Sequence, residues 1–214
     1  NTFETLSFWF GTGRVFSYDW TQLTDWIYLS HSGQMKGQFG YGITLFAEDE
    51  FYKNILFEDN YGLEISFEKS FSKSISFNIK PKFGTEIIRV DAPYQARNTG
   101  LGLGIELKPS DEFKLNFRMD QSKSIRFEND EVVYSDMIAR ARFEYQATTF
   151  LNFRLVAQYH RYYDTFDIQP LISYQPGPFS IFYFGTSRTY DTSFPGWKES
   201  YGQIYLKVQK LFSF

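Results

Sequence analysis

The chain has 214 residues and a formal net charge of −3, and 21% of its residues are aromatic. A water-soluble domain of this length has a core too small for 25 Phe, 16 Tyr and 4 Trp, and its charge gives no basis for nucleic-acid binding. It contains no cysteine for a disulfide or a thiolate metal site, and no run approaches the ~20 apolar residues of a membrane helix. Many rings, many charges and short apolar runs are typical of a β-barrel whose strands alternate lipid-facing and water-facing residues.

Hairpins with one apolar face recur along the chain. Residues Tyr61–Phe83 ("YGLEISFEKSFSKSISFNIKPKF") have apolar residues at every second position on both sides of a turn at Phe71–Lys73. Gly102–Asp120 repeats this pattern around a turn at Pro109–Glu112, and Met137–Tyr159 repeats it again. A period of two interrupted by tight turns predicts antiparallel β-hairpins.

The connections between these hairpins alternate between short and long. Further tight turns are predicted at His31–Gln34 ("HSGQ") and Gln175–Phe179. Longer, more polar connections are predicted as loops at Ala47–Asn60, Val90–Asn98, Glu128–Asp136 and Asp191–Ser200. This rhythm is typical of bacterial outer-membrane barrels. We predict one all-β domain over residues 1–214, a transmembrane antiparallel up-and-down β-barrel of about 12 strands.

The last predicted strand ends on an aromatic residue. We expect it to pair with the first strand, with both termini on the periplasmic side of a Gram-negative outer membrane. We also expect the barrel-insertion machinery to recognise its alternating apolar residues, namely Leu206, Val208, Phe212 and Phe214. Lys210 takes a lipid-facing position, where a lysine near the interface can extend its amine to water.

From Phe143 onward the chain resembles a known barrel domain. The resemblance rests on "RFEYQATTFLNFRLVAQYHRYYDTFDIQPLISYQPGPFSIFYFGTSRTYD" (Arg142–Asp191) and the closing "QIYLKVQKLFSF" (Gln203–Phe214). These stretches are similar to the C-terminal barrel of bacterial surface proteins that begin with a carbohydrate-binding family nine-like domain (domain of unknown function family 5916).

The resemblance covers about the last third of the chain. Arg154 and Gln158 fit the family's hairpin pattern, whereas Lys210-Leu211-Phe212 stands where the family has "YLF". It implies that a periplasmic or surface domain precedes this chain in a longer protein, and it brings no catalytic residues with it.

A basic cluster is predicted on the water-facing side of the barrel. Its members share the parity of the polar residues and are Arg118, Arg140, Arg142, Arg154, Lys80 and Lys82, with Lys114 as an extension. One interpretation is an eyelet that contacts anionic solutes such as acidic sugars or phosphates. The other is a charge-paired wall filling a narrow lumen, which the interleaved Glu106, Asp120 and Glu144 favour.

The two histidines give weak signals. His31 falls in a predicted turn, and His160 has water-facing parity near Asp164 and Asp167 at the outer rim. A rim-site hydrolase would use such groups to activate water, but a solvated rim is the commoner explanation. His160 also has the wrong parity for a lipid-facing His–Ser pair.

Acidic and aromatic residues near the loops allow two further interpretations. Glu48-Asp49-Glu50 and Glu58-Asp59 lack the spaced Asp/Asn-Gly pattern of a calcium loop, so we expect no metal and no cofactor. A sugar-stacking surface or an interfacial girdle would account for Trp9, Trp20, Trp26, Tyr134, Tyr162, Tyr163, Tyr190 and Trp197. The girdle is favoured for most of them, and Trp197 is the candidate for ligand contact.

We therefore expect a non-enzymatic outer-membrane barrel that anchors a larger surface or periplasmic assembly. The alternative is a channel for small, anionic or saccharide solutes, and a rim-site hydrolase is the third possibility. The expected partners are lipopolysaccharide and phospholipid, the barrel-insertion machinery, and a preceding domain or partner subunits, with no nucleic acid.

Overall fold

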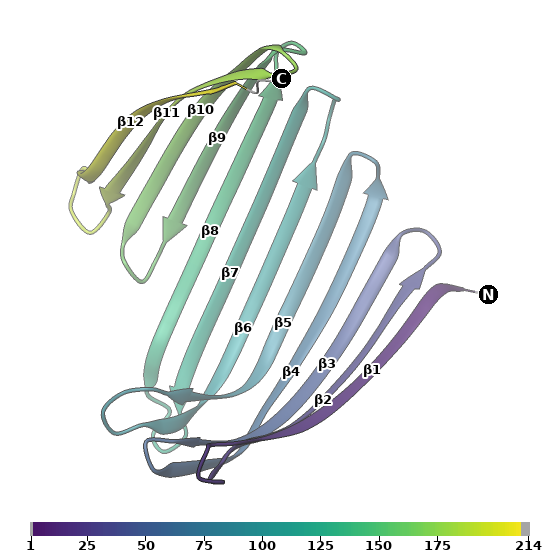
Figure 1. Cartoon of the computed structure of the whole chain (residues 1–214), viewed down its shortest axis with the longest axis vertical. Coiled ribbons are helices and arrows are strands. Elements are labelled where there is room, and N and C mark those ends of the chain that lie inside the picture. Colours follow the sequence, from purple (N-terminus) through teal and green to yellow (C-terminus); the bar gives the residue numbers. More distant parts are fainter. Residues whose placement is uncertain (1, 211–214) are drawn as a thin grey trace. The chain divides into compact units, whose positions relative to one another are not determined.

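The structure is a computed structural model and describes residues 2–210. These residues form twelve β-strands in a single sheet, in which each strand lies beside its neighbours in the sequence (Figure 1). In chain order they are β1 (Phe3–Phe16), β2 (Gln22–Met35), β3 (Phe39–Tyr52), β4 (Ile55–Ser72), β5 (Ile75–Ile88), β6 (Tyr94–Leu107), β7 (Phe113–Arg126), β8 (Val132–Gln146), β9 (Leu151–His160), β10 (Thr165–Gly177), β11 (Ser180–Asp191) and β12 (Lys198–Lys210). Within 2–210 we find no helix with the length and apolar character needed to cross a membrane.

The predicted fold class is confirmed as an all-β, antiparallel, up-and-down arrangement of 12 strands. The order begins at β1 and ends at β12, so each of these strands pairs on one side only within the described residues. The sheet is therefore not closed there, and the pairing of the last strand with the first stays a prediction.

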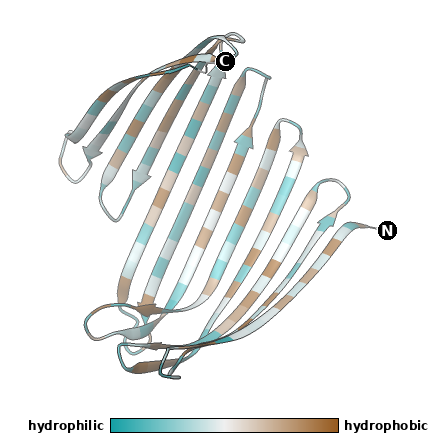
Figure 2. Ribbon diagram, in the orientation of Figure 1, coloured by the Kyte–Doolittle hydropathy of each residue, from teal (hydrophilic) through white to brown (hydrophobic). Residues whose placement is uncertain are grey.

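Alternation along the strands gives the sheet two chemically different faces, visible as bands of opposite hydropathy along the ribbons in Figure 2. The strand registers place residues of one kind side by side. On the face that we call apolar, one row across β1–β4 contains Phe10, Leu29, Leu45 and Leu63. On the opposite face, which we call polar, a row contains Ser7, Ser32, Gly42 and Ser66.

The apolar face is exposed rather than buried against another layer. Phe8 is 71% exposed, Phe10 is 52% exposed and Leu45 is 47% exposed. Near the other end of the chain, Leu206 and Val208 of the predicted insertion signal also lie exposed on β12. Phe212 and Phe214, the rest of that signal, lie outside the described residues.

One predicted loop is wrong and the other three are shorter than predicted, because the strands are longer than the alternation indicates. β3 continues to Tyr52 and β4 starts at Ile55, so the segment predicted as a loop at 47–60 is mostly strand. Lys53 and Asn54, with φ of 50° and 63°, form a two-residue hairpin turn there. Strands of 14 or more residues exceed the ~9–11 residues that cross a bilayer, and their outer ends can be polar on both faces.

The predicted turn at His31–Gln34 is also wrong. His31 lies within β2 on the apolar face, where its ring hydrogen-bonds the Tyr41 hydroxyl (2.8 Å) and the Ser7 carbonyl (3.1 Å). The chain turns instead at 36–38, where Gly37 has a φ of 81°. This left-handed conformation favours glycine, which explains why the turn is there.

The chain groups into two compact units. One contains the chain up to Phe71 together with Phe77–Leu103 and Asp120–Ser135, and the other contains Ser72–Ser76, Gly104–Met119 and the chain from Asp136 onward. The polar face of β1–β4 belongs to the first unit almost entirely, and β9–β12 belong to the second.

Candidate functional site

A group of four large aromatic side chains lies on the polar face in the middle of β1–β3. They are Trp9, Trp26, Tyr28 and Phe46, which we call the inner aromatic cluster. Tyr28 and Phe46 are directly opposite each other in the register of β2 and β3. The Trp9 ring meets the Tyr28 ring edge-on at a centroid distance of 4.8 Å.

Glycines make room for these rings. The rings of Trp9, Trp26 and Phe46 occupy the space that a side chain would need at Gly11, Gly13 and Gly62 respectively. Aromatic residues commonly cover glycines in this way and thereby protect the strand pairing around them. Trp9 nevertheless remains 53% exposed and Phe46 40% exposed, so part of each ring stays accessible on the polar face.

This placement corrects the sequence interpretation for two tryptophans. Trp9 and Trp26 were expected in the interfacial girdle, but the strand registers place them among polar residues. The parity of Trp9 indicates this placement, because Trp9 lies between Phe8 and Phe10. It must therefore point away from the face that those two residues share.

Below the inner aromatic cluster, toward the β2–β3 turn, the polar face carries hydroxyl and amide groups. Ser30 and Thr44 are paired across β2 and β3, with their hydroxyls 3.3 Å apart. Next comes a cleft of about 290 Å³. Its polar-face lining comprises Thr5, Ser32, Gln34, Gly40, Gly42, Ser66, Glu68, Asn78 and Lys80.

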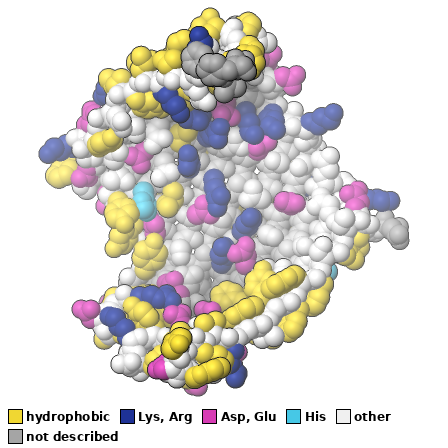
Figure 3. Space-filling model, in the orientation of Figure 1, with side chains coloured by type: hydrophobic (Ala, Val, Ile, Leu, Met, Phe, Trp, Pro, Cys, Tyr) yellow, Lys and Arg dark blue, Asp and Glu magenta, His cyan; other side chains and the backbone are white. Residues whose placement is uncertain are grey.

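The predicted basic residues lie on several strands. Arg118 is on β7, Arg140 and Arg142 are on β8, and Arg154 is on β9. Arg142 hydrogen-bonds Glu144, whose register partner on β9 is Arg154. Arg142, Glu144 and Arg154 therefore bring two cations and one anion together on the polar face of the second unit. Figure 3 shows cationic and anionic side chains interspersed over the face of the central strands.

The predicted lysines also have acidic neighbours. Lys82 on β5 forms an ion pair of 2.7 Å with Glu64 on β4. Lys114 on β7 lies 3.0 Å from Glu106, while Lys80 lines the cleft of the first unit. Anion contact by the basic cluster stays a prediction, and these pairs show how much of its charge is locally compensated.

A polar network on β5–β7 is not predicted by the sequence pattern. Asn98 donates to the hydroxyls of Ser122 (3.2 Å) and Ser124 (3.1 Å), and Ser124 donates to Glu86. Ser124 is fully buried, which explains why its hydroxyl needs these partners. The only sequence signal was the shared polar parity of these residues, because the pairing that joins them depends on strand register.

His160 has a different acidic partner from those suggested by the sequence. Its Nε2 lies 2.8 Å from Asp136 on β8, rather than beside Asp164 or Asp167. Asp136 is 8% exposed and also accepts the backbone N–H of Tyr162 (3.1 Å). This pair fastens the β9–β10 turn to β8, so its geometry supports a structural role.

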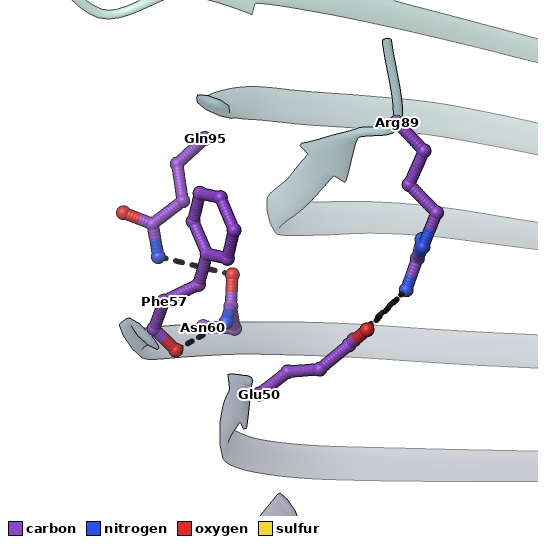
Figure 4. A network of polar contacts seen from close by, with 5 residues as sticks. All are labelled: Glu50, Phe57, Asn60, Arg89 and Gln95. Atoms are coloured by element: carbon purple, nitrogen blue, oxygen red, sulfur yellow. Dashed lines mark hydrogen bonds and ion pairs between the residues drawn. The ribbon is translucent and has the colours of Figure 1, made fainter. Parts of the chain in front are cut away.

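The acidic segments considered for calcium also make contacts within the protein. Glu50 accepts two 2.8 Å hydrogen bonds from Arg89, and Asp49 accepts the backbone N–H of Asp59 (2.9 Å). Beside them, Gln95 donates to Asn60 (3.0 Å), as Figure 4 shows. Among residues 2–210 no group of three acidic or histidine side chains is arranged to hold a metal.

Trp197 lies in the connection between β11 and β12, with a φ of 47°. Its ring packs against Phe166 of β10 at a centroid distance of 5.1 Å, and 52% of the residue is exposed. The contact with Phe166, a residue on the apolar face, fits the interfacial girdle better than a ligand site. Ligand contact by Trp197 has no further support from this geometry.

Comparison with known proteins finds one distant structural likeness. No family model and no curated protein matches the chain. Among solved structures, the chain is similar to the "CymD monoaromatic hydrocarbon channel", with 11% sequence identity and a TM-score of 0.41. The match covers 94% of this chain and 77% of that one. A likeness this distant does not bear on function.

Proposed function

We propose that the chain forms the wall of an outer-membrane β-barrel and that its polar face lines a water-filled channel for small solutes. The observation that carries this proposal is the separation of side chains between the two faces. Exposed Phe and Leu residues on one face suit acyl chains, whereas hydroxyls and ion pairs on the other suit water. In this proposal β1 and β12 have their free edges paired, because unpaired backbone groups are costly in hydrocarbon.

The inner aromatic cluster and the cleft support a channel rather than an anchor alone. An anchor needs only that its interior be filled, and ion pairs such as Lys82–Glu64 can fill it. A cleft of about 290 Å³ beside exposed rings leaves space and contacts that a solute can use.

Conductance in planar bilayers tests the channel directly. The full-length protein, refolded in detergent, should give discrete current steps after addition to one side of the bilayer. The same protein kept unfolded in urea and diluted into the same chamber is the control. A protein that is folded and inserted but adds no current above background would contradict the channel.

Anchoring is the second candidate, favoured by the ion pairs of β4–β9 and by the resemblance of the last third of the chain. Here the barrel holds a preceding domain or partner subunits at the membrane and has no catalytic activity of its own. Fractionation of cells that express the full-length protein, with and without this chain, tests it. A preceding domain that stays in the membrane fraction after this chain is deleted would contradict anchoring.

A further inference from the structure

We propose that the inner aromatic cluster and the hydroxyl-lined cleft form one binding track for neutral saccharides on the polar face of β1–β4. This inference rests on the proposed channel and names the class of solute that the channel would take. All the residues of the track belong to the first compact unit.

The position of the rings favours sugar binding. The accessible parts of Trp9 and Phe46 lie on the face that carries the polar groups. The faces of a sugar ring carry weakly positive C–H groups, which are attracted to the negative face of an aromatic ring. An exposed ring among hydroxyls can therefore bind a sugar that is dissolved in water. The rings on the apolar face point to lipid in the proposed barrel and cannot contact that sugar.

The order of groups along the strands suits an extended ligand. Moving from the inner aromatic cluster toward the β2–β3 turn, the polar face presents Ser30 and Thr44, then Ser32 and Ser66, then Gln34. Tyr28 and Ser32 are four residues apart on β2, which places them about 13 Å apart along the strand. A linear oligosaccharide can thus contact the rings with one sugar and the hydroxyls with another.

The charges in the cleft suit a neutral ligand. The cleft contains one acid, Glu68, and one lysine, Lys80, among mostly hydroxyl, amide and glycine neighbours. With one group of each sign, the cleft has no preference for an anion or a cation. Hydroxyl donors and acceptors suit a neutral sugar, whereas an apolar aromatic compound would contact only the rings of the inner aromatic cluster.

The test uses the full-length protein in planar bilayers with maltohexaose, cellohexaose and xylohexaose as probes. At least one of these neutral oligosaccharides should block the open-channel current in a concentration-dependent way. W9A and F46A should raise the half-blocking concentration about tenfold, or about 1.4 kcal/mol, while W9F should retain most of the block. Benzyl alcohol, an uncharged aromatic compound that can contact the rings but not span the cleft, should block more weakly than the most effective sugar.

Matched controls are the neighbouring residues on the opposite face. F8A and L45A remove a ring or an aliphatic side chain of similar exposure from the same strands, and they should leave the half-blocking concentration unchanged. Heat-modifiable mobility on gels shows whether each variant is folded. If W9A does not fold, F46A and W9F carry the comparison.

The outcomes separate this inference from the proposed channel. Current without block by any of the three sugars, or block that W9A and F46A leave unchanged, would overturn the saccharide track and keep the channel. Stronger block by benzyl alcohol would assign the track to aromatic compounds instead. If no current is seen, quenching of tryptophan fluorescence by the sugars in detergent, reduced in W9A, would support the track without the channel, and its absence would overturn both.

Discussion

The Phe46 ring on β3 lies over Gly62 on β4 and takes the space that a side chain at position 62 would need. A similar close approach occurs one strand further, where Gly84 of β5 lies against the backbone of Tyr61 and Gly62. At this level of the sheet the polar face is therefore built from rings and glycines. The Phe46 ring and the backbone of β4 can approach Gly62 and Gly84 this closely only because these glycines have no side chain.

Replacing Gly84 by alanine should impair folding. A Cβ at Gly84 would overlap the Tyr61 carbonyl oxygen and lie 2.8 Å from the Gly62 Cα. Both are backbone atoms that cannot rotate away, so we expect a loss of about 1–3 kcal/mol in the free energy of unfolding. Refolding yield into detergent, read from heat-modifiable gel mobility, measures this loss. The control is G177A, since no atom lies within 4 Å of a Cβ there; equal yields for the two variants would contradict the prediction.

A charge on the apolar face should be costly if that face contacts lipid. Leu45 lies between Leu29 and Leu63, so L45K would place an ammonium group among acyl chains. We expect a destabilisation of about 2–4 kcal/mol, measured by guanidinium titration in lipid vesicles. The matched variant T44K points the same group to the polar face, near Glu64, and should cost less than about 1 kcal/mol. Equal costs would mean that the two faces meet the same solvent.

Ion selectivity should follow the acids as well as the bases. Glu106 lies 3.0 Å from Lys114 and 2.9 Å from Lys108. E106Q removes the negative charge and leaves both ammonium groups uncompensated, so the reversal potential in a KCl gradient should shift toward anion selectivity. Replacing Arg142 by glutamine should shift it in the opposite direction. The control, E112Q, makes the same charge change in the β6–β7 turn and should have a smaller effect.

Loss of Asp136 should free the β9–β10 turn. Its carboxylate holds both His160 and the backbone of Tyr162. In D136A we expect trypsin to cut after Arg161 at least several times faster, because the turn opens more often while the rest of the sheet remains paired. D164N, in the same turn, keeps the left-handed conformation of that residue and should be cut at the original rate. Mass spectrometry of the fragments gives both rates.

Alternation in the sequence was sufficient to predict the number of strands and the composition of the apolar face. A row such as Leu29, Leu45 and Leu63 follows from parity alone once the strands are placed in order. Turn positions were harder. Gly33 in "HSGQ" suggested a turn, but β2 runs through it and the chain turns at Gly37, where the backbone has positive φ.

Contacts that depend on register could not be predicted. His160 meets Asp136 because β8 and β9 pair in one particular register, and a shift of one residue would turn one of them to the other face. The inner aromatic cluster was partly predictable, since the parity of Trp9 opposes that of Phe8 and Phe10. The glycine that Phe46 covers was not, because Phe46 and Gly62 are neighbours only through the pairing of β3 with β4.

The width of the pore that this wall can enclose depends on what pairs with the outer edges of β1 and β12. In a closed barrel the strand count sets the diameter, so whichever strands complete these two edges fix the circumference of the pore. In a wide barrel, the aromatic side chains of Trp9 and Phe46 would line one side of a spacious passage. In a narrow barrel, the opposite wall would be so close that a passing molecule could touch these side chains and that wall at the same time.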